Sequence, residues 1–311
     1  MHPLAVIGNV NVDLIMGLDA TWPQMGTEVI VGHDELRVGG SAGNCALAWA
    51  AMGVEHQIAA TVGDDQFGRW LQDAFGRRSQ DWPTHDGATT ISVGITHPGN
   101  ERTFLTTLGH LPHMALNHVM AALDGEALKG GIALLCGSFL TDRFTAEYPA
   151  FFAWARANNV RVGLDTGWPV AGWTEENRTA CLSWLASTDI ALFNETETVS
   201  LAGIEDVGAA AIKLRATMPN NSIFVAKLGA AGAIAATGGD TLIAVPAPKV
   251  AVIDTIGAGD VFNAGFLWAL AEGLPIRACL ERGTEIASRA ISTQPRRYDD
   301  LADLPQTEPA R

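Results

Sequence analysis

The sequence predicts an α/β fold with three layers, in which helices cover both faces of a mostly parallel central sheet and a small β-sheet forms a lid. Three observations lead to this prediction. Short apolar runs alternate with helix-forming segments through most of the chain. Polar side chains directly follow several of these runs. Two segments, approximately residues 14–38 and 89–107, interrupt the alternation with strand-like runs of their own.

The apolar runs are the expected strands of the central sheet. Residues 4–8, Leu-Ala-Val-Ile-Gly, form a run that is typical of a strand buried on both faces. Further strands are expected at residues 56–62, 131–135, 160–164, 190–193 and 223–226, and helices at residues 44–52, 149–158, 175–186 and 207–217. One more apolar strand is expected to end at Asp254, before a helix from about Asp260 to Glu272. This order of elements favours a parallel sheet.

The two interrupting segments are expected to form the lid. Residues 89–107 contain two strand-like runs around a Pro-Gly-Asn turn, which is a hairpin pattern. Together with residues 14–38 they are expected to supply antiparallel strands that project from the core. The exposed edge of such a lid favours pairing with a second subunit, so we expect a homodimer through the lid. We expect one domain of residues 1–298, followed by a C-terminal tail of residues 299–311.

Composition limits the classes of function. Hydrophobic residues make up 48% of the 311 residues, which is enough for a substantial core. The formal net charge of −14 argues against nucleic acid and anionic membranes as partners. No run of about 18 apolar residues is present, and the N-terminal segment lacks signal-peptide features, so we expect a cytoplasmic protein. The four cysteines are scattered and are expected to be free thiols.

The segment from Asp254 to Asp260, Asp-Thr-Ile-Gly-Ala-Gly-Asp, is the most specific feature of the sequence. Gly257, Ala258 and Gly259 are small, so their backbone N–H groups are able to approach a ligand closely and to point at a phosphate. The positive end of the following helix strengthens such an anion site. Asp260 would then accept the proton of a hydroxyl that attacks a phosphoryl group. The alternative interpretation is that Asp260 only caps the helix.

This segment resembles the DTxGAGD signature of the ribokinase-like carbohydrate kinases, the PfkB family. The resemblance implies a ribokinase-like fold and an ATP-dependent kinase in which Asp260 is the catalytic base. It also implies that the backbone of Gly257, Ala258 and Gly259 forms the anion hole. We further expect contacts to ATP from Thr255, Gly257, Gly259 and Asn263. Similar motifs follow in the family's order between about residues 4 and 293.

Two N-terminal motifs are similar to the acceptor-binding motifs of this family. Residues 39–44, Gly-Gly-Ser-Ala-Gly-Asn, resemble its GG motif, which implies that Gly39 and Gly40 approach the substrate and that Asn44 binds its hydroxyls. Asn11 and Asp13 match the NxD motif after the first strand, whose aspartate also binds substrate hydroxyls. The alternative interpretation of the two glycines is an ordinary turn before a helix.

Two further motifs point to the nucleotide and its metal ion. Asn194 and Glu197 match the family's NxxE motif, which implies that they help to position Mg²⁺, largely through water. A solvated helix start would have the same pattern. Lys227, Gly229 and Gly232 lie in a segment that resembles the nucleotide-side (T/K)xGxxG motif, which implies contact with ATP. The sequence has neither a P-loop nor a dinucleotide GxGxxG fingerprint.

Three more features bear on the site. Arg102 is the one cation in residues 89–107 and is expected to contact the substrate, although a solvated turn residue would look the same. Asp165 opens the segment Asp-Thr-Gly-Trp-Pro after an expected strand, where it would line the site near the phosphates. After residues 290–292 the family often continues into a glycine-containing segment that helps to bind a monovalent cation, whereas this chain reads Thr-Gln-Pro-Arg-Arg. Dependence on K⁺ is therefore open.

The resulting prediction is a kinase that transfers the γ-phosphoryl group of Mg·ATP to a hydroxyl of a sugar or sugar-like molecule. A nucleoside kinase with the same chemistry and a different lid lining is the nearest alternative. A catalytically idle ligand sensor is a second alternative, against which the intact motifs argue. An NAD-dependent Rossmann enzyme lacks its glycine fingerprint. The sequence names neither the acceptor nor the hydroxyl that is modified.

Overall fold

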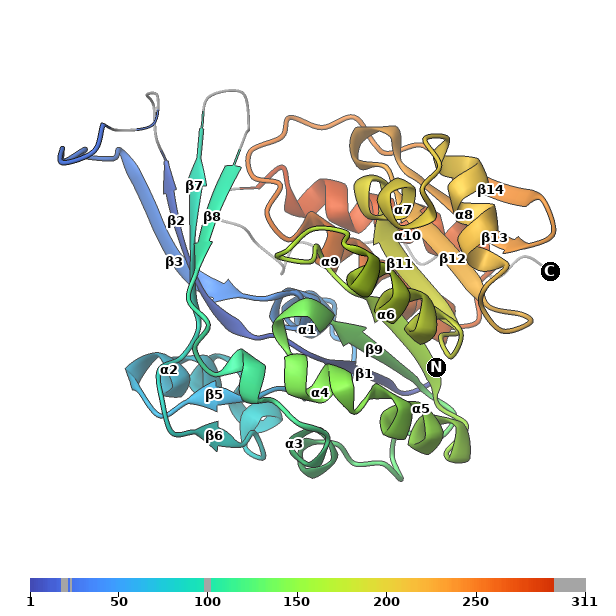
Figure 1. Cartoon of the computed structure of the whole chain (residues 1–311), viewed down its shortest axis with the longest axis horizontal. Coiled ribbons are helices and arrows are strands. Elements are labelled where there is room, and N and C mark those ends of the chain that lie inside the picture. Colours follow the sequence, from blue (N-terminus) through green and yellow to red (C-terminus); the bar gives the residue numbers. More distant parts are fainter. Residues whose placement is uncertain (18–21, 23, 98–101, 294–311) are drawn as a thin grey trace.

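The computed structural model describes residues 1–17, 22, 24–97 and 102–293. Within these residues the central sheet has eight strands (Figure 1). In spatial order the strands are β14 (Thr241–Val245), β13 (Ala233–Gly238), β12 (Ile223–Lys227), β11 (Ile190–Asn194), β10 (Arg161–Asp165), β9 (Ile132–Cys136), β1 (Leu4–Ile7) and β4 (Gln57–Ala59). The six strands from β12 to β4 are parallel, and β13 and β14 are antiparallel additions. The predicted mostly parallel sheet is confirmed.

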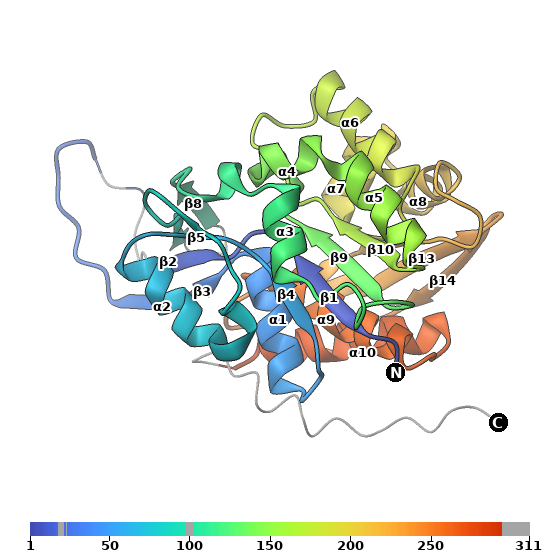
Figure 2. The ribbon, with the colours of Figure 1, turned by 90° about the horizontal axis from the view of Figure 1, so that it is seen from below.

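Two helical layers cover this sheet (Figure 2). One layer contains α1 (Ser41–Ala51), α9 (Ala258–Ala271) and α10 (Ile276–Ala290); the other contains α3 (Leu116–Ala122), α4 (Asp142–Ala146), α5 (Tyr148–Ala157), α6 (Glu175–Leu185), α7 (Glu195–Ala202) and α8 (Val207–Arg215). Side chains alternate between the layers, because Leu4 and Val6 pack with the first group and Ala5 and Ile7 with the second. A strand buried on both faces needs apolar residues throughout, which is why this run lacks polar positions.

A separate four-stranded sheet projects from the core and forms the lid (Figure 1). Its order is β3 (His33–Gly39), β2 (Asn11–Gly17), β7 (Ile91–Thr96) and β8 (Arg102–Thr106). The pairs β2–β3 and β7–β8 are antiparallel as expected, but the central pair β2–β7 is parallel. The two strand pairs come from separate parts of the chain, so no tight turn constrains their relative direction. The expected Pro-Gly-Asn turn lies outside the described residues.

Two strand predictions were wrong. The run at 56–62 is not one strand, because it leaves the central sheet after β4 and enters β5 (Val62–Gly63), which pairs with β6 (Thr84–His85) beside α2 (Gln66–Phe75). The run before Asp254 is not a strand. Val250, Val252 and Ile253 are instead exposed in a loop, since β14 already forms the edge of the sheet. Their apolar pattern mimics a strand, and α9 starts at Ala258, slightly earlier than expected.

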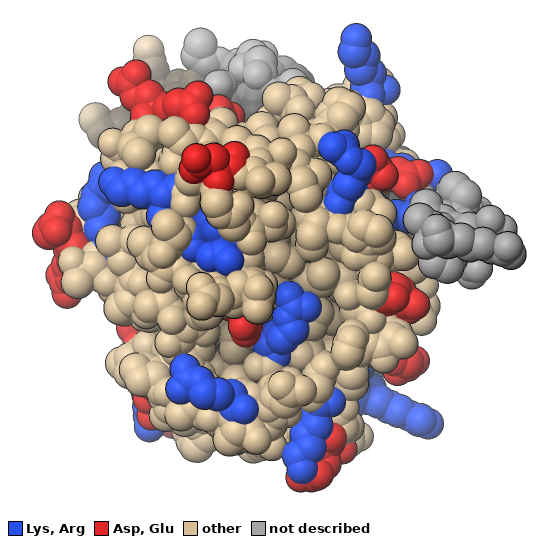
Figure 3. Space-filling model, turned by 90° about the vertical axis from the view of Figure 1, so that its right-hand side faces the viewer, with Lys and Arg blue, Asp and Glu red and all other residues tan. Residues whose placement is uncertain are grey.

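The surface and termini add three observations. On the face shown in Figure 3, Lys and Arg side chains lie singly or in small groups among acidic and uncharged ones, rather than in one basic patch. Within the described residues, none of the helices is both long and apolar enough to span a membrane. The four cysteines, Cys45, Cys136, Cys181 and Cys279, are buried free thiols, as expected. The predicted tail at residues 299–311 lies outside the described residues.

Candidate active site

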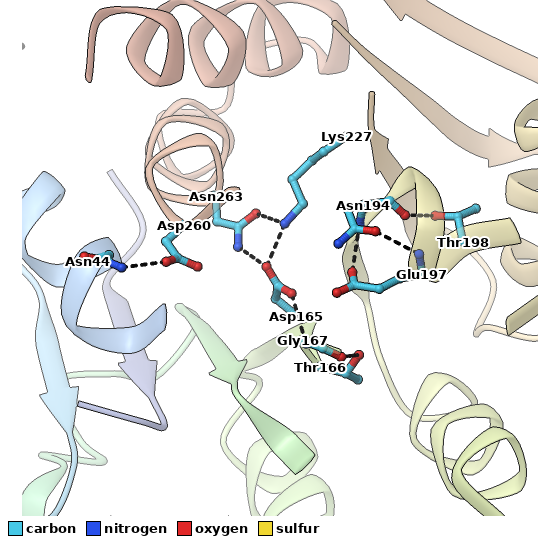
Figure 4. Close-up of polar contacts among 10 residues, drawn as sticks. All are labelled: Asn44, Asp165, Thr166, Gly167, Asn194, Glu197, Thr198, Lys227, Asp260 and Asn263. Carbon is cyan, nitrogen blue, oxygen red and sulfur yellow. Dashed lines mark hydrogen bonds and ion pairs between the residues drawn. The ribbon is translucent and has the colours of Figure 1, made fainter. Parts of the chain in front are cut away.

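Three neighbouring strands place their last residues at one edge of the central sheet. β10 ends at Asp165, β11 at Asn194 and β12 at Lys227, and the last two are register partners. Because parallel strands bring their carboxyl ends together, these polar residues collect where ligands bind in α/β folds. The start of α9 lies at the same edge, so that Asp260 and Asn263 complete the group (Figure 4).

Asp165, Lys227 and Asn263 form a buried network, which we name the floor (Figure 4). Lys227 Nζ lies 2.7 Å from Asp165 Oδ2 and donates to Asn263 Oδ1 at 3.2 Å, while Asn263 Nδ2 donates to Asp165 Oδ2 at 2.5 Å. Burial by itself lowers the pKa of Lys227, but the neighbouring Asp165 and Glu197 carboxylates outweigh it, so the pKa is raised. Lys227 therefore stays charged and paired.

Asp260 stands beside this network and is held by α1. Asn44 Nδ2 donates to Asp260 Oδ2 at 2.8 Å, although the two residues are 216 positions apart in the chain (Figure 4). Burial and the charge of Asp165 raise the pKa of Asp260 to about 6, and the hydrogen bonds from Asn44 and Ser41 act in the opposite direction. A carboxylate with this pKa is ionised at pH 7 and is a stronger base than an ordinary aspartate.

The turn before Asp260 presents backbone donors. Gly257 is the N-cap of α9 and has φ 72°, a left-handed conformation that favours glycine. The N–H groups of Ala258 and Asp260 donate within the turn, to Thr255 O and Gly257 O. Within the described residues no hydrogen-bond partner is found for the N–H groups of Gly257 and Gly259. A Cβ added at Gly259 would lie 3.3 Å from Lys227 Nζ, so positive charge adjoins these donors.

Asn194 and Glu197 form the capping box of α7. Asn194 Oδ1 accepts the Glu197 N–H at 2.8 Å, and Glu197 Oε2 accepts the Asn194 N–H at 2.9 Å. The pattern is thus a helix start, but not a solvated one, because Glu197 is 3% exposed. Burial and the charge of Asp165 raise the pKa of Glu197 to about 7. Three carboxyl groups, Asp165, Glu197 and Asp260, thus all raise the pKa of one cation, Lys227.

A cavity of about 770 Å³ opens above this edge. Its lining includes eleven of the predicted site residues: Arg102, Asn194, Glu197, Lys227, Gly229, Gly232, Thr255, Gly257, Ala258, Gly259 and Asp260. Asp165 and Ser41 also line it, as do the exposed apolar residues Val250 and Val252. Asn263, which was predicted to contact ATP, does not line the cavity. It is 0% exposed, and its Nδ2 donates a hydrogen bond to Asp165.

The residues predicted to bind the acceptor lie on the lid side. Asn11 and Asp13 belong to β2, and Asn11 Nδ2 donates to Asp13 Oδ1 at 2.7 Å. Gly39 ends β3, where an added Cβ would lie 2.1 Å from the Asp13 carboxyl carbon. Gly40 is the N-cap of α1, the helix that carries Asn44. These five residues do not line the cavity, and Asn44 connects them to it through Asp260.

Two residues were not assigned a role by sequence reasoning. Arg37, on β3, contacts Asp254 Oδ2 with its Nη1 at 2.7 Å. Ser41, at the first position of α1, lines the cavity and acts to lower the pKa of Asp260. Arg37 follows no motif, and a single Arg in a strand carries no signal of its distant partner. Ser41 lies inside the GG motif, where its position beside Gly40 is the one available clue.

Comparison with protein-family models bears directly on this arrangement. The model described as pfkB family carbohydrate kinase matches residues 1–298. The chain belongs to the pfkB family of carbohydrate kinases. The enzyme class predicted from the sequence, an ATP-dependent carbohydrate kinase, is thereby confirmed.

Curated relatives and solved structures agree with this family. The kinase is 26% identical over 301 residues to ribokinase of Haemophilus influenzae, with 93% of this chain and 92% of the relative covered. It is 30% identical over 213 residues to 1-phosphofructokinase of Rhodobacter capsulatus, which covers 66% of this chain and 64% of the relative, just under two thirds.

The solved structures show the fold. Adenosine kinase from Sinorhizobium meliloti superimposes with a TM-score of 0.81 at 22% identity, covering 97% of each chain. Arabidopsis thaliana ribokinase complexed with ribose and ATP gives 0.75 at 22% identity, covering 98% of this chain and 100% of that one. The predicted ribokinase-like fold is confirmed.

Proposed function

We propose that this kinase transfers the γ-phosphoryl group of ATP to a hydroxyl of a sugar or sugar-like small molecule, with Asp260 as the general base. One observation carries the proposal: Asp260 lines a cavity beside backbone N–H groups that have no hydrogen-bond partner among the described residues, and Asn44 donates to its carboxylate at 2.8 Å. A base next to an anion site is the arrangement that in-line phosphoryl transfer to an alcohol needs.

In this proposal the turn acts on the phosphoryl group that is transferred, and the base acts on the hydroxyl that attacks it. The N–H groups of Gly257 and Gly259 stabilise negative charge that develops on the phosphoryl oxygens. Asp260 accepts the proton of the attacking hydroxyl, which its raised pKa favours. Lys227 adds positive charge beside the turn. The floor keeps these groups in place because its members are buried and mutually bonded.

The site suits Mg·ATP. The cavity offers glycine backbone at positions 229 and 232 for close approach of the nucleotide. Asn194 and Glu197 would help to hold Mg²⁺ through water, and the ion would supply positive charge that neutralises the phosphates. Within the described residues, no group of three or more His, Cys, Asp or Glu side chains is arranged to hold a metal directly. The segment that bears on K⁺ runs from Thr293 into residues outside the described ones, so the question of K⁺ dependence stays open.

The acceptor is proposed to lie between the lid and Asp260. Asp13 and Asn44 would bind its hydroxyls, with Asn11 fixing the Asp13 carboxylate and Gly39 leaving room for it. Arg102 lines the cavity from β8 and is proposed to contact the substrate. This set of short polar groups favours a hydroxyl-rich ring. Phosphorylation of nucleosides alone in a panel of sugars, sugar acids, phosphosugars and nucleosides would overturn that preference.

The direct test of the mechanism is Asp260→Asn, which keeps the shape of the side chain and removes the base. Turnover should fall by about 10²-fold or more, in line with general-base contributions. Binding of a non-hydrolysable ATP analogue should persist. Turnover that stays at the wild-type level would reject Asp260 as the base.

A homodimer through the lid remains our proposal. Leu36, Leu14, Val93 and Leu105 are register partners across all four lid strands and share one face. Leu36 is 47% and Leu105 is 56% exposed, so apolar side chains are open to solvent at both edges of this row. A monomeric mass in solution would remove the proposal. Cytoplasmic location and the absence of nucleic-acid and membrane partners stay predictions.

A further inference from the structure

Arg37 carries a mostly buried guanidinium that the proposed mechanism does not use. It lies on lid strand β3, and its side chain is 12% exposed. Its Nη1 lies 2.7 Å from Asp254 Oδ2 and 3.6 Å from Glu35 Oε2. Arg37 and Asp254 are 217 positions apart in the chain. Their contact therefore joins the lid to the loop that precedes the anion-hole turn.

Asp254 anchors this loop from several sides. Its Oδ1 accepts the backbone N–H of Ile256 at 2.8 Å. Its own backbone N–H and that of Ile253 donate to Ile291 O, at 3.2 and 2.8 Å, which ties the loop to the end of α10. Gly257, the N-cap of α9, follows three residues after Asp254. The position of Asp254 thus determines where the turn presents its N–H groups.

Arg37 also faces the acceptor side of the site. In the β2–β3 ladder it is the register partner of Asp13, and the two charges interact. Its second terminal nitrogen, Nη2, is buried and has no hydrogen-bond partner within the described residues. A buried guanidinium donor without a partner is unfavourable, and an oxygen atom of a bound acceptor would relieve this. The Arg37 guanidinium therefore lies next to both Asp13, which is proposed to bind the acceptor, and Asp254, which holds the loop before the anion-hole turn.

We propose that Arg37 is a positioning residue that couples binding of the acceptor beneath the lid to the geometry of the anion-hole turn. The inference rests on the function proposed above. With the acceptor in place, Nη2 donates to an acceptor oxygen while Nη1 holds Asp254, so the turn is held most firmly when both substrates are present. Such coupling favours transfer to the acceptor over transfer to water.

The first test is a mutant cycle on turnover. Arg37→Gln and Asp254→Asn should each lower kcat by about 10- to 100-fold, because a small displacement of the turn misaligns the transferring group. KM for ATP should change by less than about threefold. The double variant should be no slower than the slower single variant, since both changes remove the same contact. Arg37→Lys, which keeps the charge, should recover part of kcat.

The matched control is Arg69→Gln. Arg69 pairs with Asp64 at 3.8 Å on the surface, where both side chains are about two thirds exposed, at 66% and 69%. This variant should keep wild-type kinetics. Effects of Arg37→Gln and Asp254→Asn that simply add in the double variant would overturn the inference, as would an Arg37→Gln enzyme with unchanged kcat.

The second test does not depend on phosphoryl transfer. Hydrogen exchange of peptides that cover residues 254–260 should be faster in Arg37→Gln than in the wild type, whereas exchange in β1 and β9 should be unchanged. Unchanged exchange at residues 254–260 would count against the positioning role. A third outcome is that the wild type phosphorylates no member of the acceptor panel while Arg37→Gln still exchanges faster at residues 254–260. That result would contradict the proposed function but would support the role of Arg37 in positioning the turn.

Discussion

The floor of the site and the inner row of the lid contrast in how their polar groups are satisfied. Asp165, Lys227 and Asn263 are bonded to one another within the core. The inner lid row runs through the register partners Arg37, Asp13, Ser92 and Thr106, and it meets the core through separate contacts such as the Arg37–Asp254 pair. Under the function proposed above, this difference corresponds to two roles: the preorganised floor serves the donor chemistry, and the separately built lid sheet selects the acceptor.

Breaking the floor should have the largest effect. Lys227→Met leaves the Asp165 carboxylate buried without its cation, so the free energy of unfolding should fall by about 3–5 kcal/mol. Equilibrium denaturation measures this loss. Lys129→Met is the control, because Lys129 Nζ lies at the same 2.7 Å from a carboxylate, Glu126, but with side chains 50% and 82% exposed.

The control should lose no more than about 1 kcal/mol. Equal losses in the two variants would remove the distinction between a buried floor and the protein surface. The floor would then contribute no more to stability than an ordinary surface ion pair.

Substitution of a polar lid residue should instead weaken binding of the acceptor. Asp13→Asn keeps the size of the side chain but weakens its hydrogen bonds to hydroxyls, so KM for the acceptor should rise about 10-fold or more. The dissociation constant of a non-hydrolysable ATP analogue should stay within about twofold of the wild type. Asp34→Asn, at an exposed position of β3, is the matched control and should change neither value. Selective loss of the ATP analogue in Asp13→Asn would contradict the division between floor and lid.

The pH dependence of kcat/KM tests the contact between the two regions, the hydrogen bond from Asn44 to Asp260. A base must be ionised to act, so kcat/KM should fall as pH drops through about 6, the pKa to which burial and Asp165 raise Asp260. Removal of the Asn44 hydrogen bond, which lowers this pKa, should move the fall to higher pH. A profile that is flat from pH 5 to 8 would exclude this carboxylate as the titrating base.

The ionised Asp260 carboxylate should favour activity, as above, but lower the free energy of unfolding. The pKa of Asp260 lies above its ordinary value of 3.8, so between these two values the native state holds the proton more tightly than the unfolded chain does. The ionised carboxylate therefore destabilises the fold as pH rises through this window, and fully above it. Asp260→Asn should raise the free energy of unfolding at pH 7 and give no gain near pH 3. Scans of thermal unfolding at the two pH values measure the difference.

Sequence patterns alone determined the layers and the chemistry of the turn. Apolar runs mark central strands because burial on both faces forbids polar side chains, and the small residues of 257–259 before Asp260 predict an anion site within a few consecutive positions. The same reasoning failed for the run before Asp254, where apolar side chains are exposed in a loop and partly line the cavity instead of joining the sheet.

Only the tertiary structure decided which distant residues meet. The Asn44–Asp260 and Arg37–Asp254 contacts join positions 216 and 217 residues apart, and the Lys227–Asp165 pair joins positions 62 apart. Local propensity carries no information about such pairs, because they form through the packing of the lid and helices on the central sheet. The parallel pairing of β2 with β7 has the same origin: each hairpin-like pair is locally encoded, but their relative direction depends on how both leave the core.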